Sequence, residues 1–307
     1  MGRDAETHLR VSVVIPSWNR SVQLHACLQA LAASFAPDAE VIVVADGGAP
    51  PAFPGLSALA ERLNLRLLHV PHGGPAQARN RGLQIARGAV VAFIDDDCLP
   101  EPQWLERLAA AVSQDPPIAA GGRTQNGSPS NPYAEAFHLV LDMAAMDQQR
   151  CQHGPSFFPS NNLAFPTEVL RRLGGFNPAF QTAEDRELCR RWLHTGYKLV
   201  SAPEAVVAHF PVLNLAGFWR KCSAYGKGAA QFHAGSGSQS RRRSLAFHLR
   251  VPHLAMRLTA GKRLRRRVAL AALLLLWEAA NLAGYLKERW RHQRHKRWGV
   301  GPIEAQS

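Results

Sequence analysis

Alternation between apolar strand-like runs and helix-like segments is the feature of this chain that most constrains its fold. Four runs rich in Val and Ile occur early in the sequence, and each of the first three is followed by a helix-like segment. Strands that alternate with helices pair in parallel, because each helix returns the chain to the same end of the sheet. Near-continuous Val and Ile also indicate strands buried on both faces. The predicted strands are 11–15, 40–45, 65–70 and 90–94, and the predicted helices are 21–33, 55–63 and 75–86.

Three consecutive carboxylates, Asp95, Asp96 and Asp97, directly follow the fourth apolar run. Left unpaired they would repel one another, whereas a divalent ion such as Mg²⁺ or Mn²⁺ takes oxygen ligands and also neutralises bound phosphates. In open α/β sheets, ligands lie just beyond the carboxyl ends of the strands. The cluster therefore indicates a metal-assisted phosphate site, and a solvated acidic loop is the alternative that the cluster alone leaves open.

Polar residues also follow the first two strands. The first strand ends in a turn with Pro16, Asn19 and Arg20, which could meet a nucleotide, although Pro and Asn are common turn residues. The second strand ends at Asp46, which could accept hydrogen bonds from a base or a ribose or could only cap its turn. A Gly-Gly-Pro sequence then starts the helix that carries Arg79, whose guanidinium could pair with phosphate or with the Asp cluster.

The middle of the chain continues with helices and one irregular stretch. Pro or an acidic residue in the first turn predicts three helices, at 101–113, 166–173 and 184–194. The Gly, Ser, Asn and Pro content of 121–132 predicts a loop. Glu184 and Asp185 open the last of these helices, where acids often serve only as helix-dipole partners. Beside a metal loop, one of these carboxylates could instead act as a general base.

Charge divides the chain into two parts. The net charge is +13, but residues 1–219 hold 17 Lys and Arg against 20 Asp and Glu, whereas 220–307 hold 19 against 3. We expect a catalytic domain over 1–212 and a basic helical region over 213–307, with a Gly/Ser-rich break at 235–240. A basic region can contact nucleic acid or an anionic membrane. Nucleic acid is disfavoured, because the region lacks interleaved aromatic side chains and nucleic-acid binding leaves the acidic cluster unexplained.

An apolar run at 268–286 lies inside the basic region. Its 19 residues barely reach the roughly 20 that a spanning helix needs. Glu278, Asn281 and Tyr285 recur along it at helical spacing, and basic clusters flank both of its ends, which opposes a single span. We expect a helix that lies in the membrane interface or packs in a helical hairpin, with a core helix and a spanning helix as alternatives.

Cysteine usage and the amino terminus bear on the compartment. The five cysteines lack the spacing of a zinc site or a disulfide framework, which favours a reducing compartment. The amino terminus is polar and shows no signal-peptide pattern. We therefore expect a cytoplasmic protein attached peripherally to the inner face of the cell membrane, with Trp277 and Tyr285 near the headgroups.

Taken in order, these motifs resemble those of the family 2 glycosyltransferases, which have the GT-A fold. The matching elements are the Pro-x-x-Asn turn at 16–19, Asp46, Gly-Gly-x-x-x-Ala-Arg-Asn-x-Gly at 73–82, Asp-x-Asp at 95–97, Asn161-Asn162, Gly174-Gly175-Phe176 and Glu184-Asp185. The resemblance covers the chain from about Val11 to Trp192. Each motif alone is weak evidence, but their shared order is specific.

The resemblance implies a Rossmann-like, mostly parallel sheet covered by helices and an inverting transfer from a nucleotide-diphosphate sugar to a hydroxyl acceptor, with Mg²⁺ or Mn²⁺ on the diphosphate. For the donor nucleotide it implies contacts with Pro16, Asn19, Arg20, Asp46, Arg79, Asp95 and Asp96. For the metal it implies Asp97, Asp95 and, as in some relatives, His209, although a satisfied strand-end histidine is the alternative. It makes Asp185 the base, with Glu184 beside it.

One departure from the family pattern concerns polymer synthesis. Processive synthases of the family carry Gln-x-x-Arg-Trp, but here Leu188 stands where the Gln would precede Arg191 and Trp192. We therefore expect a non-processive enzyme. A nucleotidyltransferase with a similar Asp-rich metal site is the alternative function. Such enzymes usually carry a Gly-rich signature near the first strand, and here that turn reads Pro-Ser-Trp-Asn-Arg.

Overall fold

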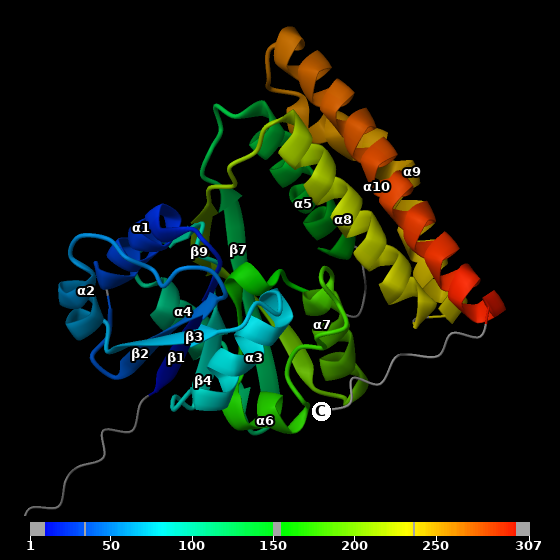
Figure 1. Ribbon diagram of the computed structural model, residues 1–307. Helices are drawn as coiled ribbons and strands as arrows, with labels where there is room; N and C mark the ends of the chain where they lie inside the picture. Colours follow the sequence, from blue (N-terminus) through cyan, green and yellow to red (C-terminus); the bar gives the residue numbers. More distant parts are fainter. Residues whose placement is uncertain (1–9, 34, 150–154, 236, 299–307) are drawn as a thin grey trace, which may run out of the picture. The chain divides into compact units, whose positions relative to one another are not determined.

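The computed structural model describes residues 10–33, 35–149, 155–235 and 237–298, and it divides the chain into two compact units (Figure 1). The sheet unit holds the described residues up to Ser128 and those of 148–211, and the helical unit holds 129–147 and the described residues from Val212 onward. The helical unit thus takes in a middle segment that lies within the expected catalytic domain. The polar amino terminus and Cys151 lie outside the described residues, and the other four cysteines are buried and free.

The sheet unit is built on nine strands in the described residues, in the order β3-β2-β1-β4-β8-β7-β9-β5, with β6 paired to β7. The strands are β1 Val11–Ser17, β2 Ala39–Asp46, β3 Leu65–Val70, β4 Val90–Phe93, β5 Cys98–Pro100, β6 Ser113–Gln114, β7 Pro117–Asn126, β8 Leu163–Pro166 and β9 Lys198–His209. The first four pair in parallel, whereas β8 and β5 join antiparallel to their neighbours. The predicted fold class, a helix-covered α/β sheet, is confirmed.

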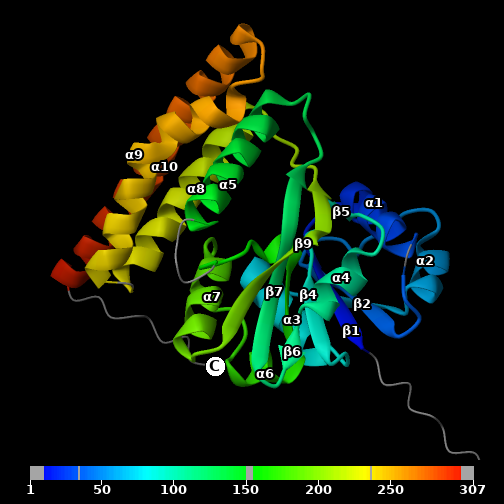
Figure 2. The ribbon, with the colours of Figure 1, turned by 180° about the vertical axis from the view of Figure 1, so that it is seen from behind.

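Helices cover both faces of this sheet (Figures 1 and 2). One face packs against α1 Ser21–Ala32, α2 Leu56–Arg62 and α4 Trp104–Ala110, and the other against α3 Pro75–Ile85, α6 Thr167–Arg172 and α7 Glu184–His194. Within β1, Val13 and Ile15 join the first core and Val14 joins the second, because successive strand residues point to opposite faces. A short 3₁₀ turn, Ser160–Asn162, precedes β8.

The predicted loop at 121–132 is wrong, because its first half belongs to β7. A Cβ on Gly121 would lie 1.9 Å from the ring of Phe158, and one on Gly122 would lie 2.2 Å from the backbone oxygen of Ala205. The glycines therefore allow close packing within a strand, a use that composition cannot distinguish from a loop. The predicted helix at 101–113 is also too long, since α4 ends at Ala110 and β6 begins at Ser113.

The helical unit contains α5 Pro132–Gln149, α8 Leu215–Ala234, α9 Gly237–Thr259 and α10 Leu264–Trp298. Most of the predicted break at 235–240 is wrong, because α9 already begins at Gly237. Helices α8 and α10 lie along each other (Figure 1). A Cβ on Gly226 would lie 1.9 Å from the backbone oxygen of Asn281, and one on Gly284 would lie 1.9 Å from that of Ser223. These two glycines let the helices approach backbone to backbone.

Helix α10 has one buried face and one exposed face. Its buried residues, Leu270, Leu274, Trp277 and Ala280, share a core with residues of α5, α8 and α9. Trp277 is only 4% exposed and stacks on His248, so its expected place near the headgroups is wrong. Of the polar residues of the run, Glu278 pairs with His248, and the backbone of Asn281 lies against Gly226.

The opposite face of α10 is apolar and exposed. It carries Val268, Leu275, Leu282, Leu286 and Trp290, each more than half exposed. Among the described residues α10 is the one helix whose length and composition would suit a membrane crossing, over Leu264–Arg294, and 28% of its apolar stretch is buried inside the structure. The core alternative therefore describes one face of this helix, and no described residue of the unit covers the other face.

Candidate active site

The three consecutive carboxylates lie between β4 and β5, at the carboxyl end of the parallel strands. Asp96 and Asp97 have side chains only 4% and 9% exposed, and one nitrogen of Arg20, Nη1, lies 3.1 Å from Asp96 Oδ1 and 3.1 Å from Asp97 Oδ2. Ser17 Oγ donates a 2.8 Å hydrogen bond to Asp96. Burial raises the pKa of Asp96 to about 6, although Arg20 opposes the shift. Arg20 therefore compensates two buried acids that would otherwise repel each other.

Arg79 joins the third carboxylate to the start of α7. Its Nη2 donates to Asp95 Oδ1 at 2.6 Å and its Nη1 donates to Glu184 Oε1 at 2.9 Å. The guanidinium is buried and lies 5.5 Å from the centre of the Phe176 ring. Burial lowers the pKa of Arg79, but Asp95 and Glu184 raise it above its ordinary value. A permanently charged arginine thus links two acidic segments that are far apart in the sequence.

Glu184 and Asp185 occupy the first turn of α7. Asp185 accepts hydrogen bonds from the backbone N–H groups of Arg186 at 2.7 Å and Ser160 at 3.3 Å. Burial raises the pKa of both carboxyls. The pKa of Glu184 reaches about 7, first through burial and then through the neighbouring Asp185. A half-buried carboxylate with a raised pKa is a better proton acceptor than an ordinary surface acid.

A group that could hold a metal lies next to the Asp cluster. Cys98 pairs with His209 across the antiparallel β5 and β9, and the ligand atoms of Asp97, Cys98 and His209 all lie within 4.8 Å of one another. His209 Nε2 is 3.4 Å from Asp97 Oδ1. Burial raises the pKa of the Cys98 thiol well above its ordinary value. Asp97 and His209 offer a carboxylate oxygen and an imidazole nitrogen as donors. This donor set suits Mn²⁺ or a similar divalent ion. The Asp95 carboxylate faces Arg79 and is not part of the group.

The residues expected near the nucleoside lie at the ends of β1 and β2. Asp46 accepts backbone hydrogen bonds from Gly73 at 2.7 Å and Gly74 at 2.9 Å, so it fixes the turn before α3. Asn19 adopts a left-handed backbone with φ of 53°, and its side chain lies against Gly48. Pro16 is half buried and lies near the end of β1, shortly before Asn19. Pro16, Asn19 and Asp46 thus come from two neighbouring strand ends.

Two aromatic rings at this edge were missed by the sequence reasoning. Trp18, which is 54% exposed, stacks on His72 with 4.7 Å between ring centroids. His72 Nδ1 also lies 3.0 Å from Asp46 Oδ2. The signal for Trp18 in the sequence is an aromatic residue inside a polar turn. His72 carried no signal, because its contacts join β1, β2 and the segment after β3.

Arg191 and Trp192 make contacts inside the sheet unit. Arg191 pairs with Glu187 at 2.7 Å and donates to the backbone oxygens of Leu173 and Gly175. Trp192 and Leu188 are fully buried. Neither Trp192 nor Leu188 is exposed to a substrate.

Known proteins of one family resemble this chain. The family model described as glycosyl transferase family 2 matches residues 12–174. A pre-mycofactocin glycosyltransferase of Mycobacterium tuberculosis (strain ATCC 25618 / H37Rv) is 33% identical over 230 residues, which cover 73% of this chain and 47% of that protein. Glycosyltransferase AglE of Haloferax volcanii is 27% identical over 226 residues, which cover 72% and 73%. The chain thus spans about half the length of the first of these relatives.

A solved structure shares the fold. Mannosyltransferase PcManGT from Pyrobaculum calidifontis superposes with a TM-score of 0.60 at 19% identity, over 92% of this chain and 87% of that one. The shared fold is that of the GT-A glycosyltransferases. The family match and the relative at 33% identity show that the chain belongs to glycosyl transferase family 2.

Proposed function

We propose that the chain is a metal-dependent, inverting and non-processive glycosyltransferase that moves a sugar from a nucleotide-diphosphate donor to a hydroxyl acceptor. The observation that carries this proposal is the Arg79 link, which ties Asp95 after β4 to Glu184 in the first turn of α7. It keeps the segment with the candidate base, Asp185, beside the acidic cluster. An inverting transfer needs a base for the acceptor and a cationic site for the leaving diphosphate in such proximity.

In the proposed reaction, Asp185 takes the proton of the acceptor hydroxyl while the hydroxyl oxygen attacks the anomeric carbon. The bond from that carbon to the diphosphate oxygen breaks on the opposite side, which gives an inverted glycoside and a nucleoside diphosphate. Asp97 and His209 would hold the divalent ion, which neutralises charge on the diphosphate when bound. Arg20, half exposed beside Asp96 and Asp97, is within the same charged group and can assist.

For the donor nucleoside we propose the edge formed by Pro16, Asn19 and Asp46, with the exposed Trp18 ring beside them. An exposed aromatic ring next to a carboxylate suits a base, which offers a flat face and polar edges. PcManGT, which shares the fold, was solved in complex with GDP-Man and Mn²⁺. That complex supports a nucleotide sugar and a divalent metal as ligands of this chain.

We further propose that the helical unit attaches the enzyme to the cytosolic face of an anionic membrane. The exposed apolar face of α10 supports this, because its flanks carry Arg263, Arg265 and Lys287 among other basic residues. Apolar contact and basic flanks together favour the membrane interface.

The test is a screen of nucleotide sugars with the purified protein and Mn²⁺, read as release of nucleoside diphosphate. Activity with one donor, lost with EDTA and restored by Mn²⁺, is the expected result. The anomeric configuration of a transferred product, read by NMR, tests inversion. Release of pyrophosphate from a nucleoside triphosphate and a sugar phosphate would instead support the nucleotidyltransferase alternative.

A further inference from the structure

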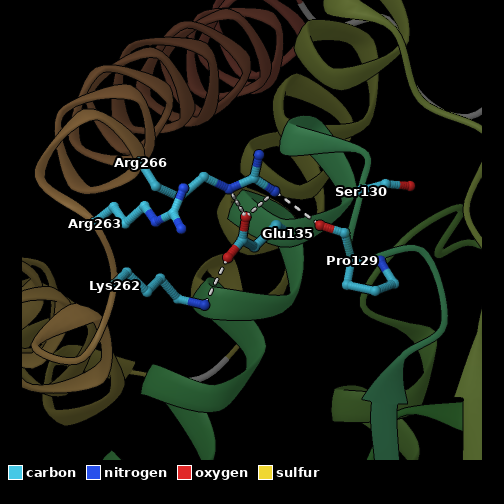
Figure 3. A pocket seen from close by; sticks show the side chains of 6 residues that line it. All are labelled: Pro129, Ser130, Glu135, Lys262, Arg263 and Arg266. Atoms are coloured by element: carbon cyan, nitrogen blue, oxygen red, sulfur yellow. Dashed lines mark hydrogen bonds and ion pairs between the residues drawn. The ribbon is translucent and has the colours of Figure 1, made fainter.

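His72, in the segment that follows β3, has no part in the proposed transfer chemistry. Its side chain is 55% exposed at the edge where β1 and β2 end. By contrast, side chains that line a cavity in the helical unit pair with one another, since Glu135 binds both Lys262 and Arg266 (Figure 3). The strand-end edge instead presents an aromatic ring to solvent.

A hydrogen bond fixes the orientation of the His72 ring. Its Nδ1 lies 3.0 Å from the backbone oxygen of Asp46 and 3.0 Å from Asp46 Oδ2. A backbone oxygen can only accept a hydrogen bond, so Nδ1 carries the proton and donates it. The Asp46 carboxylate is 4% exposed and is itself held by the backbone N–H groups of Gly73 and Gly74. The imidazole is thus joined to a carboxylate that other contacts already hold in place.

The backbone beside Asp46 also positions His72. Gly47 has a φ of 77°, and a Cβ on it would lie 2.8 Å from the Cβ of His72. Only glycine allows so close an approach in this conformation. The Gly47 N–H donates to the backbone oxygen of Val70 at 2.8 Å, which ties the turn after β2 to the end of β3. The location of the His72 side chain is therefore set by packing as well as by its hydrogen bond.

His72 in turn holds the ring of Trp18, which lies in the turn between β1 and α1. The two rings stack with 4.7 Å between centroids and 24° between planes, and Trp18 is 54% exposed. A side chain in an exposed turn has several rotamers, and a ligand that stacks on it must offset the entropy of fixing one of them. Because His72 already covers one face of Trp18, the ring is held in advance and its other face is left for a flat ligand.

We propose that His72 is a positioning residue for the nucleobase of the donor. It holds the Trp18 ring so that the other face of that ring stacks on the base. The inference rests on the nucleoside edge in the proposed function and adds the residue that prepares this edge for the base. Its effect is confined to the base, because the groups proposed for the diphosphate are those of the acidic cluster.

The experiment compares ligands with and without a base on the full-length protein. Calorimetry in the presence of Mn²⁺ measures the affinity for UDP, GDP, ADP and CDP, and for inorganic pyrophosphate, which has no base. His72→Ala should weaken binding of the preferred nucleoside diphosphate by about tenfold, as expected for a disturbed base stack, and leave pyrophosphate binding unchanged. Equal losses for the two kinds of ligand, or no loss for either, would overturn the proposal.

The matched control is His25→Ala. His25 also stacks on an aromatic ring in the sheet unit, that of Phe53, with 4.5 Å between centroids. Its removal should change neither affinity. If the wild-type protein binds neither pyrophosphate nor any of the nucleoside diphosphates, the proposed function is overturned together with this inference. Loss of base-dependent binding in His72→Ala alone is the result that supports the inference.

Two further variants separate the ring of His72 from its hydrogen bond. His72→Phe keeps a flat ring, and His72→Asn keeps an N–H donor but has no ring. We expect His72→Phe to bind the nucleoside diphosphate within about threefold of the wild-type protein and His72→Asn to lose about as much as His72→Ala, because stacking on Trp18 needs the ring. The opposite order would assign the effect to the contact with Asp46 and overturn the proposal.

A double substitution tests whether His72 acts through Trp18. In a protein that already carries Trp18→Ala, His72→Ala should cause no further loss of nucleoside diphosphate affinity, because residues that act together give non-additive losses. Additive losses would overturn the proposal. With a donor sugar, His72→Ala should raise KM by about tenfold and leave kcat unchanged, since the base stack is the same in the ground state and the transition state. A fall in kcat with unchanged KM would contradict a role at the base.

Discussion

The two units differ in whether their charged side chains are balanced by partners of opposite charge. In the sheet unit, two arginines pair with acids of the candidate site: Arg20 with Asp96 and Asp97, and Arg79 with Asp95 and Glu184. In the helical unit, basic residues greatly outnumber acids and an apolar helix face is exposed. Charges compensated inside a fold serve positioning and chemistry, whereas uncompensated charges beside apolar surface are available to an external partner.

The largest effect is expected from a substitution in the candidate metal group of Asp97, Cys98 and His209. It tests whether the charges of the sheet unit serve chemistry. Asp97→Ala should reduce transfer below detection and remove metal-dependent nucleotide binding, because the carboxylate would join the protein to the ion on the diphosphate. Calorimetry with nucleoside diphosphate, with and without EDTA, checks this. Asp38→Ala is the control, since Asp38 pairs with Arg10 at the surface. Unchanged affinity with and without EDTA in the wild-type protein would refute the assignment.

The next prediction concerns a substitution in α7 that should lower turnover without weakening donor binding. Asp185→Asn keeps the shape of the side chain but cannot accept a proton, so turnover should fall by roughly a hundredfold or more while donor binding persists. Steady-state kinetics with a separate binding assay measure the two quantities. Glu168→Gln, an exposed acid on α6, should leave both unchanged. Near wild-type turnover of Asp185→Asn would shift the role of base to Glu184.

Replacing the buried Arg79 tests whether its pairs with Asp95 and Glu184 stabilise the sheet unit. Arg79→Met leaves Asp95 and Glu184 without their partner, and losing one member of a buried charge group typically costs about 3–5 kcal/mol. Urea unfolding followed by circular dichroism gives the free energy of unfolding. Arg81→Met on the exposed side of the same helix is the matched control. If both variants lose the same stability, the Arg79 link is not a structural requirement.

The pH dependence of the free energy of unfolding tests Glu184, and the expected effect is smaller. Because the pKa of Glu184 is raised to about 7 in the folded protein, the folded state retains a proton that the unfolded state has released above pH ~4.5. Stability should therefore fall as pH rises through this window, by a few kcal/mol at most, since one pKa unit corresponds to about 1.4 kcal/mol. Thermal unfolding in EDTA should show a weaker fall for Glu184→Gln. A profile identical to that of the wild-type protein would mean that Glu184 titrates normally.

The smallest expected effect lies in the helical unit. Leu275→Gln changes an exposed side chain, so donor hydrolysis and unfolding should not change, whereas binding to anionic vesicles should weaken by roughly three- to tenfold through lost apolar contact. Leu67→Gln, exposed in the sheet unit, is the control and should float normally. A point substitution is needed because removal of α10 would take Leu274 and Trp277 out of the core. Equal flotation of both variants would contradict a membrane role for this face.

Much of the sheet unit could be predicted from the sequence. The strand at 65–70 and the helix at 184–194 have the predicted bounds, and the other early elements differ by one or two residues. Their signals are local: runs of Val and Ile, and first-turn acids or Pro. The location of the Asp95–Asp97 cluster after a parallel strand could also be predicted, since the carboxyl ends of parallel strands meet at one edge.

By itself, the sequence determined the alternation of strands and helices, the order of the motifs and the division of charge, because these depend on neighbouring residues and composition. Only the tertiary structure decided that Gly121 and Gly122 belong to a strand, that Arg20 braces two aspartates and that His72 stacks on Trp18. It also decided that α10 turns Glu278 inward and leaves Leu275 exposed. Each of these depends on contacts between segments distant in the chain, and which neighbours a side chain meets is fixed only when those segments pack together.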